Sequence, residues 1–312
     1  MSPIPHGDLL IAAPRRWDEA TFAVPAIRAL AASGLAVGVL CEERQEGFWK
    51  TLTEVRVVTF PVGAKAKTIA AGLSGNWAAA LAWEKGIGAE AFVGAKIGRR
   101  LGVEGKIPAK WLTHPLSITV SPLEHRVRFY LSAAEAMGVA TDRAEFFSPA
   151  DTGRKSSGGL LICPDSDFGA HYEWPLERWE EIARAFQERG ISIEIGTFAC
   201  GRGLGKLLAE CLGGEIPLVE LGELGKDLPL IAAYPSVLCA DGSLAHLASH
   251  LGATCAVLFG PNDPAWKRPL GTRHRVIRQH VECAPCLLEK CVMDLRCQKE
   301  LAVARVLKGL SL

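Results

Sequence analysis

The stretch SVLCADGSLAHLASHLGATCAVLFG, residues 236–260, reads as a strand, a sharp turn, a helix and a second strand. The apolar runs at its two ends have the length and composition of buried parallel strands. Between them, small and apolar residues follow a pattern typical of a helix that begins near Ser243 or Leu244. A strand–helix–strand unit of this kind indicates an α/β protein with parallel sheets.

The turn inside this stretch carries most of its polar groups. Gly242 and Ser243 allow a tight bend. The first N–H groups of the following helix lack intrahelical partners, and they form the positive end of the helix dipole. We therefore expect a phosphate-binding site in the backbone, with Asp241 on a sugar hydroxyl. The residues concerned are Asp241, Gly242, Ser243, Leu244, Ala245 and His246. The alternative is structural, with Asp241 as a helix cap and His246 packed inside the protein.

Strand-like and helical segments alternate along the whole chain. In the first half, strands are expected at residues 9–13, 35–41 and 55–60, with weaker candidates at 77–83 and 91–95. A polar segment, ADTGRKSSGG at 150–159, has the composition of a linker, and the alternation restarts after it. We therefore predict two domains, residues 1–150 and 151–312, each with an open parallel sheet whose ligands lie at the carboxyl ends of the strands.

Composition narrows the functional class. The 312 residues are 49% hydrophobic and 22% charged, which suits two globular domains. A formal net charge of +1 argues against a nucleic-acid-binding protein, because such proteins have a basic excess. The sequence contains no run of 18 apolar residues, so no transmembrane segment is predicted. The N-terminal sequence also lacks the basic region of a signal peptide. These features indicate a cytoplasmic protein.

Four of the ten cysteines are clustered near the end of the chain. Six are scattered, mostly in apolar runs, and read as buried thiols in a reducing compartment. The cluster has the spacing C-x2-C-x4-C-x5-C and consists of Cys283, Cys286, Cys291 and Cys297. A C-x2-C pair suits a structural zinc site, but the second half lacks the spacing of a zinc ribbon. Structural zinc and reduced thiols both remain open, and no catalytic role is expected.

The opening stretch and its continuation resemble the ADP-heptose:lipopolysaccharide heptosyltransferases of glycosyltransferase family 9. The chain keeps the family's aspartate and histidine at Asp241 and His246, and the Gly-Pro-x-x-Pro loop at 260–264. It departs at Ala240, where the family has asparagine, and its Gly-Ser order is reversed. Three further segments align in the same order, and the last two are most like the heptosyltransferase II branch. These segments are 13–30, 163–179 and 283–300.

The resemblance implies a GT-B fold, with two Rossmann-like domains facing a cleft. It also implies an acceptor-side N-terminal domain and a C-terminal domain that binds the nucleotide sugar. The implied activity is inverting transfer of heptose from ADP-heptose to the lipopolysaccharide inner core, with no metal required. The partners would be the donor and a lipopolysaccharide core acceptor, met at the inner face of the inner membrane.

The resemblance also implies a general base in the first domain. Aligning on Pro25 places Asp18 and Glu19 on the family's Gly-Asp pair, so Glu19 is the candidate base with Asp18 beside it. Two neighbouring carboxylates disfavour the full ionisation of both. The alternative is structural: both acids lie at a helix N-terminus, where negative side chains stabilise the helix dipole.

The loop before Trp174 departs most from the family. Alignment there puts Tyr172 and Glu173 where the family has Lys and Arg, and puts Asp165 at a family glycine. That lysine is the expected clamp on the donor's diphosphate. We count Tyr172, His171 and Asp165 among the donor-binding residues, since His171 could supply positive charge when protonated. Other candidates to replace the lysine are Arg15, Arg16, Arg202 and Lys206.

Three additional acids, Asp18, Asp165 and Glu173, therefore lie in segments where the donor and acceptor are expected. They open two alternatives to the heptosyltransferase interpretation. One is a related glycosyltransferase that uses another nucleotide sugar. The other is a catalytically weakened family member that acts as a binding protein in envelope assembly. The retained Asp241 and His246 favour an enzyme.

Overall fold

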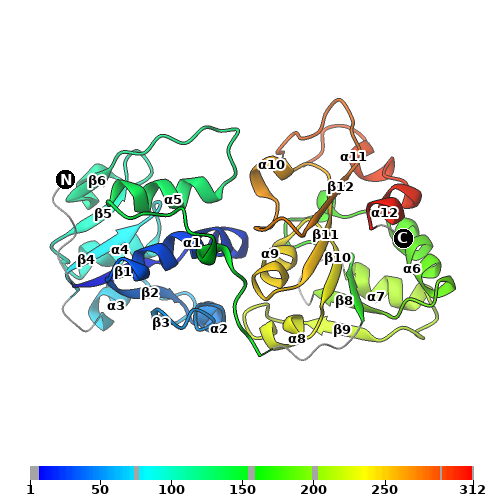
Figure 1. Cartoon of the computed structure of the whole chain (residues 1–312), viewed down its shortest axis with the longest axis horizontal. Coiled ribbons are helices and arrows are strands. Elements are labelled where there is room, and N and C mark those ends of the chain that lie inside the picture. Colours follow the sequence, from blue (N-terminus) through cyan, green and yellow to red (C-terminus); the bar gives the residue numbers. More distant parts are fainter. Residues whose placement is uncertain (1–6, 74–76, 154–158, 199–202, 289, 311–312) are drawn as a thin grey trace. The chain divides into compact units, whose positions relative to one another are not determined.

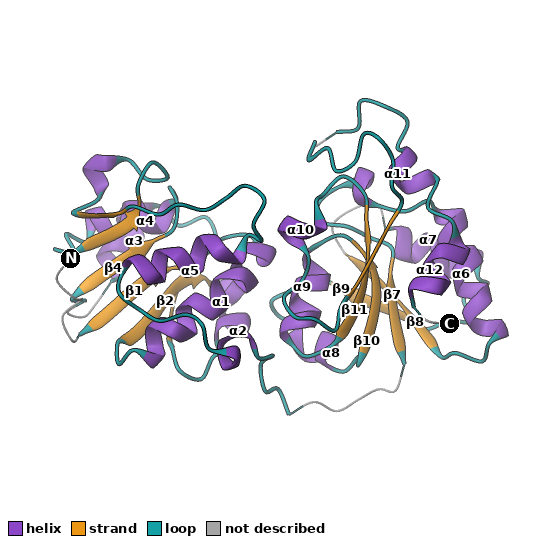
Figure 2. Ribbon diagram, turned by 45° about the horizontal axis from the view of Figure 1, so that its top comes forward, coloured by secondary structure: helices purple, strands orange, loops and turns teal. Residues whose placement is uncertain are grey.

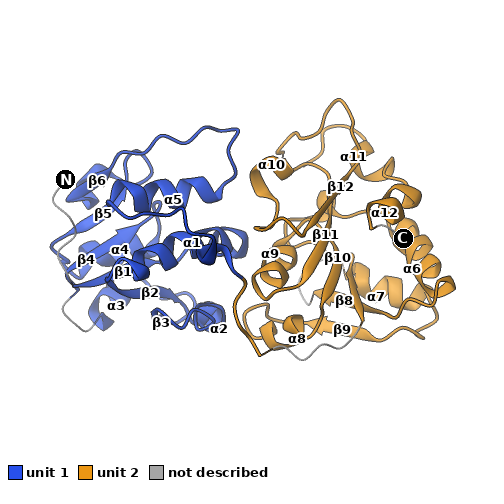
Figure 3. Cartoon of the chain, in the orientation of Figure 1, with its two compact units in different colours: residues 1–148 blue, residues 149–312 orange. Residues whose placement is uncertain are grey.

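The computed structural model describes residues 7–73, 77–153, 159–198, 203–288 and 290–310. It divides into two compact units, residues 1–148 and 149–312 (Figure 3). Each unit contains a six-stranded sheet in which neighbouring strands run parallel, with helices connecting them (Figure 1). The predicted α/β class with two parallel sheets is confirmed.

Unit 1 has the strand order β3-β2-β1-β4-β5-β6. Its strands are β1 (Asp8–Ala12), β2 (Ala36–Glu42), β3 (Arg56–Phe60), β4 (Ala79–Ala82), β5 (Arg100–Val103) and β6 (His114–Leu116). Its α-helices are α1 (Trp17–Ala32), α2 (Glu46–Trp49), α3 (Ala66–Gly72), α4 (Ile87–Gly94) and α5 (Val127–Ala136). Short 3-10 helices lie at Glu43–Gln45, Ala109–Trp111 and Ala144–Phe147.

The helices of unit 1 cover both faces of its sheet. From β1 the chain moves outward one way to β2, and from β4 it moves the other way to β5, so right-handed crossovers place α1 and α4 on opposite faces. Leu10 and Leu40 pack with Ile69 of α3 and Phe92 of α4 in one buried cluster. On the other side α1 packs against α5.

The weak strand expected at 91–95 is wrong, because these residues belong to α4 and its end. A short apolar run does not distinguish a strand from a buried helix. Here the tertiary packing selects the helix. A Cβ added to Gly88 would lie 2.7 Å from the Cβ of Ala12, so the helix can approach β1 this closely only with glycine at that position.

Unit 2 has the strand order β12-β11-β10-β7-β8-β9. Its strands are β7 (Leu160–Cys163), β8 (Ile193–Phe198), β9 (Leu218–Leu221), β10 (Ser236–Ala240), β11 (Thr254–Phe259) and β12 (Arg275–Arg278). Its α-helices are α6 (Leu176–Glu188), α7 (Leu204–Cys211), α8 (Leu228–Ala232), α9 (Ser243–His250), α10 (Pro264–Lys267), α11 (Arg296–Lys299) and α12 (Val303–Gly309). A 3-10 helix lies at Ala170–Tyr172.

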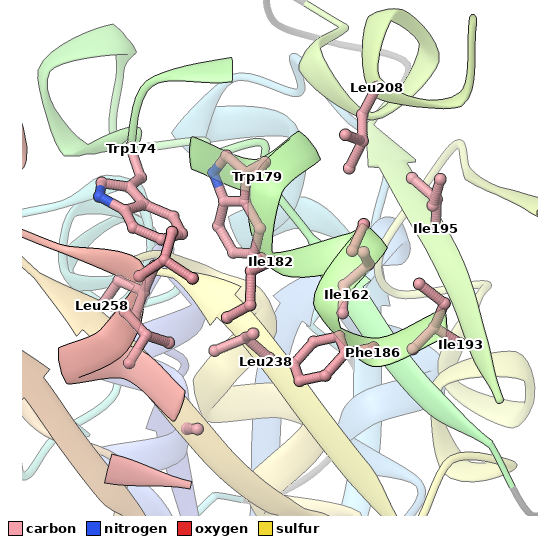
Figure 4. Close-up of a cluster of buried hydrophobic side chains, with 14 of the residues drawn as sticks. Ile162, Trp174, Trp179, Ile182, Phe186, Ile193, Ile195, Leu208, Leu238 and Leu258 are labelled. Carbon is pink, nitrogen blue, oxygen red and sulfur yellow. The ribbon is translucent and has the colours of Figure 1, made fainter. Parts of the chain in front are cut away.

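A tryptophan-rich core anchors the loop that follows β7. Figure 4 shows Trp179 and Phe186 of α6 packed with side chains from β7, β8 and β10. Trp174, at the end of the loop, lies edge-on to Trp179 with 5.4 Å between ring centroids, and its Nε1 donates to the Leu301 carbonyl at 2.9 Å. The end of the loop 164–173 is therefore anchored by Trp174.

The sheet order of unit 2 brings distant loops together. β7 lies between β10 and β8, so the loops that leave the carboxyl ends of these parallel strands are neighbours. Figure 2 shows α8 and α9 along one face of this sheet and α6, α7 and α12 along the other. In neither unit do the described residues include a helix with the length and hydropathy needed to span a membrane.

Candidate functional site

The turn between β10 and α9, with the first residues of α9, is called the 241–246 turn. It is hydrogen-bonded to the loops that follow β7 and β11. The Asp241 side chain is fully buried, and its Oδ2 accepts a 2.7 Å hydrogen bond from Nδ2 of Asn262, in the loop after β11. The Asp241 carbonyl accepts a 2.6 Å hydrogen bond from Oγ of Ser166, in the loop after β7. His246 is also buried, one turn into the helix.

The N-terminus of α9 binds a carboxylate from the β7 loop. The N–H of Ser243 donates to Oδ1 of Asp167 at 2.8 Å, and Oγ of Ser243 donates to Oδ2 at 2.6 Å. A Cβ on Gly242 would lie 2.9 Å from Asp167 Oδ1, so the missing side chain at this position makes room for the carboxylate. The predicted sharp turn and helix start are present, and they hold the side chain of Asp167.

Asp165 faces a different helix. Its carboxylate accepts the backbone N–H groups of Leu204 and Gly205 at the start of α7, at 2.7 and 3.2 Å. It also accepts Oγ1 of Thr197 at 2.9 Å and the N–H of Phe198 at 3.3 Å. We predicted a donor contact for Asp165, but its buried carboxylate is directed to the N-terminus of α7, where it serves as the cap that the helix itself lacks.

The remaining residues of the β7 loop are packed against their own neighbours. Oε1 of Glu173 accepts the N–H of Ser166 at 3.2 Å, so its charge is turned inward. Tyr172 is buried, with its ring against those of Phe168 and His171. Nε2 of His171 lies 2.9 Å from the Leu288 carbonyl, so it donates a hydrogen bond away from the 241–246 turn.

The basic residues considered as replacements for the family lysine are engaged in ion pairs where the structure describes them. Lys206 lies 3.0 Å from Glu220, Arg15 3.5 Å from Glu42 and Arg16 3.1 Å from Asp18. Arg202 lies outside the described residues.

In unit 1, Glu19 is the centre of a buried polar cluster. Nε of Arg126 donates to both carboxylate oxygens, at 3.1 and 2.8 Å, and the Tyr130 hydroxyl donates to Oε2 at 2.6 Å. The Arg126 guanidinium also lies over the Phe129 ring, 4.1 Å from its centroid. Asp18, fully buried, pairs with Arg16, whose Nη2 lies 3.2 Å from Oδ2. Glu19 and Asp18 thus have different partners, although they are adjacent.

The cluster affects the pKa of both partners of Glu19. Burial raises the pKa of Tyr130 well above its usual value, and the charge of Glu19 raises it further. Burial alone would lower the pKa of Arg126, but the attraction of Glu19 outweighs it and the pKa is raised. Arg126 therefore stays charged and Tyr130 stays protonated, so both remain hydrogen-bond donors to Glu19.

A pocket of about 470 Å³ lies at the carboxyl ends of the unit 1 strands. Trp83 and Tyr130 contribute aromatic surface, with ring centroids 5.0 Å apart. Its charged lining residues are Arg15, Glu42, Glu84 and Lys85. Because Tyr130 both lines the pocket and contacts Glu19, it links the pocket to the candidate base.

The cysteine cluster surrounds one small apolar pocket in unit 2. All four of Cys283, Cys286, Cys291 and Cys297 line it, together with His171. Burial and the proximity of the other three cysteines raise the pKa of Cys297 to about 11. Among the residues that the structure describes, however, no three or more His, Cys, Asp or Glu side chains form a group that could hold a metal ion.

Sequence reasoning missed four residues of these clusters: Asp167, Asn262, Arg126 and Tyr130. Asp167 and Asn262 lie directly after β7 and β11, so their position at strand ends was a usable signal. Arg126 and Tyr130 lie at the start of α5, and nothing in the local pattern indicates that this end of the helix faces Glu19.

Comparison with known proteins assigns the chain to a family. The sequence model of glycosyltransferase family 9 (heptosyltransferase) matches residues 98–296, well over half of the chain. Lipopolysaccharide heptosyltransferase 1 of Pseudomonas aeruginosa is 29% identical over 142 residues, which are 41% of this chain and 39% of that protein. Lipopolysaccharide heptosyltransferase 2 of Escherichia coli is 28% identical over 122 residues, 38% of this chain and 35% of that protein. The chain thus matches about two fifths of the length of these curated relatives.

Solved structures show the same fold over nearly the full chain. E. coli ADP-heptose lipopolysaccharide heptosyltransferase II has a TM-score of 0.75 and 19% identity, covering 97% of both chains. E. coli heptosyltransferase WaaC with ADP has a TM-score of 0.76 and 16% identity, covering 97% of this chain and 99% of that one. A family 9 glycosyl transferase from Veillonella parvula has a TM-score of 0.80 and 11% identity, covering 99% and 97%.

These neighbours identify the two parallel-sheet units as a GT-B fold. The sequence match spans the end of unit 1 and most of unit 2, including the β7 loop, the 241–246 turn and most of the cysteine cluster. Fold and sequence therefore agree, and the chain belongs to glycosyltransferase family 9, the heptosyltransferase family.

Proposed function

We propose that the chain is an inverting glycosyltransferase that moves heptose from ADP-heptose to the lipopolysaccharide inner core, as in the heptosyltransferase II branch. Family membership and the names of the matched relatives support this activity. Two structural neighbours contain ADP and ADP-2-deoxy-2-fluoro heptose, which supports an ADP-linked donor.

The donor is proposed to bind unit 2 at the 241–246 turn. The observation that carries this is the pair of hydrogen bonds from Ser243 to the two oxygens of the Asp167 carboxylate, at 2.8 and 2.6 Å. Two oxygens of a phosphate group can accept from the same N–H and hydroxyl donors, so Asp167 stands in for an anionic ligand. Asp241 is the proposed ligand of the donor sugar, and Tyr172 and His171 would flank the nucleotide.

The proposed chemistry is a single displacement at the anomeric carbon. Oxygen of an acceptor hydroxyl forms the new glycosidic bond, the bond from the anomeric carbon to the diphosphate oxygen breaks, and ADP leaves with the electron pair. Glu19 takes the hydroxyl proton, with Asp18 as the neighbouring candidate. Arg126 and Tyr130 hold the Glu19 carboxylate in place. No step requires a metal ion.

The acceptor is proposed to bind unit 1, in the pocket lined by Trp83 and Tyr130. Aromatic surface beside charged groups suits a sugar ring that carries hydroxyl and ionised substituents. The acceptor would be the lipopolysaccharide core. The chain would then act in the cytoplasm, peripherally at the inner face of the inner membrane.

For the cysteine cluster we propose reduced thiols in a compact C-terminal segment. Structural zinc held by Cys283, Cys286, Cys291 and Cys297 is the alternative proposal, and the four residues line one pocket.

Two alternatives remain proposals: a related enzyme with another nucleotide sugar, and a weakened member that serves as a binding protein in envelope assembly. The carboxylate of Asp167 at the N-terminus of α9 favours the second, because it would repel the diphosphate of any nucleoside diphosphate sugar. The test is a transfer assay with ADP-heptose and heptosylated core acceptor, followed by mass spectrometry of the product. Product that disappears in Glu19→Gln supports the proposal, product only with another sugar nucleotide supports the first alternative, and no product with any donor supports the second.

A further inference from the structure

The loop after β7 places a negative charge where a diphosphate would bind. Asp167 is the residue concerned, and its two oxygens accept both donors of Ser243. The loop is fixed in this position by Ser166, which donates to the Asp241 carbonyl at 2.6 Å and accepts the N–H of Phe168 at 3.1 Å. The contact joins the ends of β7 and β10, which are adjacent in the sheet.

Gly242 leaves room for the contact between Asp167 and Ser243. Gly242 has extended backbone, with φ −177°, so glycine is not needed there for its conformation. A Cβ there would lie 2.9 Å from Asp167 Oδ1 and 3.2 Å from Ser166 Oγ, so a larger residue would press the Asp167 side chain away from Ser243. A carboxylate is thus accommodated closely against the start of α9, where the helix dipole stabilises negative charge.

The Asp167 side chain can nevertheless be displaced from Ser243. Its neighbours Asp165 and Ser166 are buried, whereas Asp167 itself is exposed to solvent. Rotation of this one side chain would release the N–H and hydroxyl of Ser243 without moving the backbone of the loop. A diphosphate and the carboxylate cannot occupy these donors together, because they would compete for the same hydrogens and repel one another.

We propose that Asp167 sets the donor affinity of this chain by acting as an internal competitor for the diphosphate of the nucleotide sugar. This inference rests on the proposed donor site at the 241–246 turn. The apparent dissociation constant is the intrinsic one divided by the fraction of molecules in which Asp167 has left Ser243. Binding of the donor therefore includes the displacement of Asp167, which lowers the affinity of every anionic ligand at these donors by the same factor.

The test compares wild type with Asp167→Asn. Asparagine keeps the size of the side chain, and its Oδ1 can still accept the Ser243 N–H while its amide donates to Ser243 Oγ, so the cap persists without charge. The control is Glu177→Gln, which removes one exposed acid from the first turn of α6. Calorimetry at low salt with EDTA would measure binding of ADP and of inorganic pyrophosphate to each protein.

We expect Asp167→Asn to bind both probes at least about tenfold more tightly than wild type, because a neutral amide holds the donors of Ser243 more weakly than a carboxylate and does not repel the diphosphate. Glu177→Gln should match wild type. If Asp167→Asn binds ADP no more tightly than wild type, or if Glu177→Gln gains as much, the competitor role is overturned while the donor site stands. If neither wild type nor Asp167→Asn binds ADP or pyrophosphate, the donor site and the competitor role both fail. Should Asp167→Asn not fold, Asp167→Ala is measured by the same criteria.

Discussion

Tyr130 donates a 2.6 Å hydrogen bond to Oε2 of Glu19, although 111 positions separate the two residues in the sequence. The bond joins α5 to the first turn of α1 and is buried. It connects the candidate base to the unit 1 pocket, because Tyr130 also lines that pocket. The position of the Glu19 side chain therefore depends on a helix that sequence reasoning did not associate with it.

Replacing Tyr130 with Phe should reduce both stability and turnover. A buried hydrogen bond to a charged group contributes about 1.5–3 kcal/mol, and urea denaturation would measure that loss. Turnover should fall because Glu19 loses an orienting contact.

The matched control is Tyr234→Phe. Tyr234 donates a 2.6 Å hydrogen bond to Oε2 of Glu194 in unit 2, so the same chemical change is made elsewhere. It should cost stability while leaving kcat unchanged. Equal effects of both variants on kcat would mean that Tyr130 acts only on stability.

Glu19→Gln should abolish transfer while Asp18→Asn should not. A general base contributes about 10²–10⁴-fold to rate, so kcat should fall by that order in Glu19→Gln. The variant should also lose stability, by up to about 3–5 kcal/mol, because the largely buried Arg126 keeps only Glu84, 3.9 Å away, as its counter-charge. Steady-state kinetics and chemical denaturation would measure the two effects. The reverse ranking, with Asp18→Asn inactive and Glu19→Gln active, would move the base to Asp18.

Asp165→Ala should destabilise unit 2 without a specific effect on nucleotide binding. The substitution leaves the N-terminus of α7 uncapped and removes four hydrogen bonds, at a cost of about 2–4 kcal/mol. Asp165→Asn keeps a capping oxygen and should lose much less. Urea denaturation of both variants provides the measurement, with ADP calorimetry alongside. Weaker ADP binding by a fully folded Asp165→Asn would instead support the donor contact first expected for Asp165.

The thiol of Cys297 should react slowly and with a steep pH dependence. Its pKa is raised to about 11 by burial and by the other three cysteines, so it is almost entirely protonated at pH 8, and the thiolate is the reactive form. Its rate of modification by a disulfide reagent should rise as the pH approaches 11, and mass spectrometry of peptides would follow it. A rate at pH 8 equal to that of an unshifted, exposed thiol would contradict this.

Metal analysis completes the test of the cysteine cluster. Protein purified without chelators should contain substoichiometric zinc by elemental mass spectrometry, and Cys283→Ser should leave the melting temperature nearly unchanged. One equivalent of zinc, lost together with stability in Cys283→Ser, would support the structural zinc alternative.

Local pattern predicted most of the architecture. The strands at β1, β2, β3 and β4 were recognisable as short apolar runs, and the 241–246 turn as a strand–turn–helix junction. β5 and β6 were not predicted, because RLGV and HPL are not apolar runs. α4 was predicted in part as a strand, because a short apolar run suits either structure. In α4 the close contact of Gly88 with Ala12 of β1 accompanies the helix, and the sequence of the helix alone does not predict this contact.

The sequence by itself determined the α/β class, the two parallel sheets and the acidic residues at strand ends and at the start of α1. Only the tertiary structure decided what each acid contacts. Asp165 caps α7, Asp167 caps α9 and Glu19 binds Arg126 and Tyr130. The reason is that β7 lies between β10 and β8, and α5 against α1, so residues far apart in the chain meet. Hydrogen bonds act over about 3 Å, and the order of strands that brings donor and acceptor within that distance is a property of the whole fold.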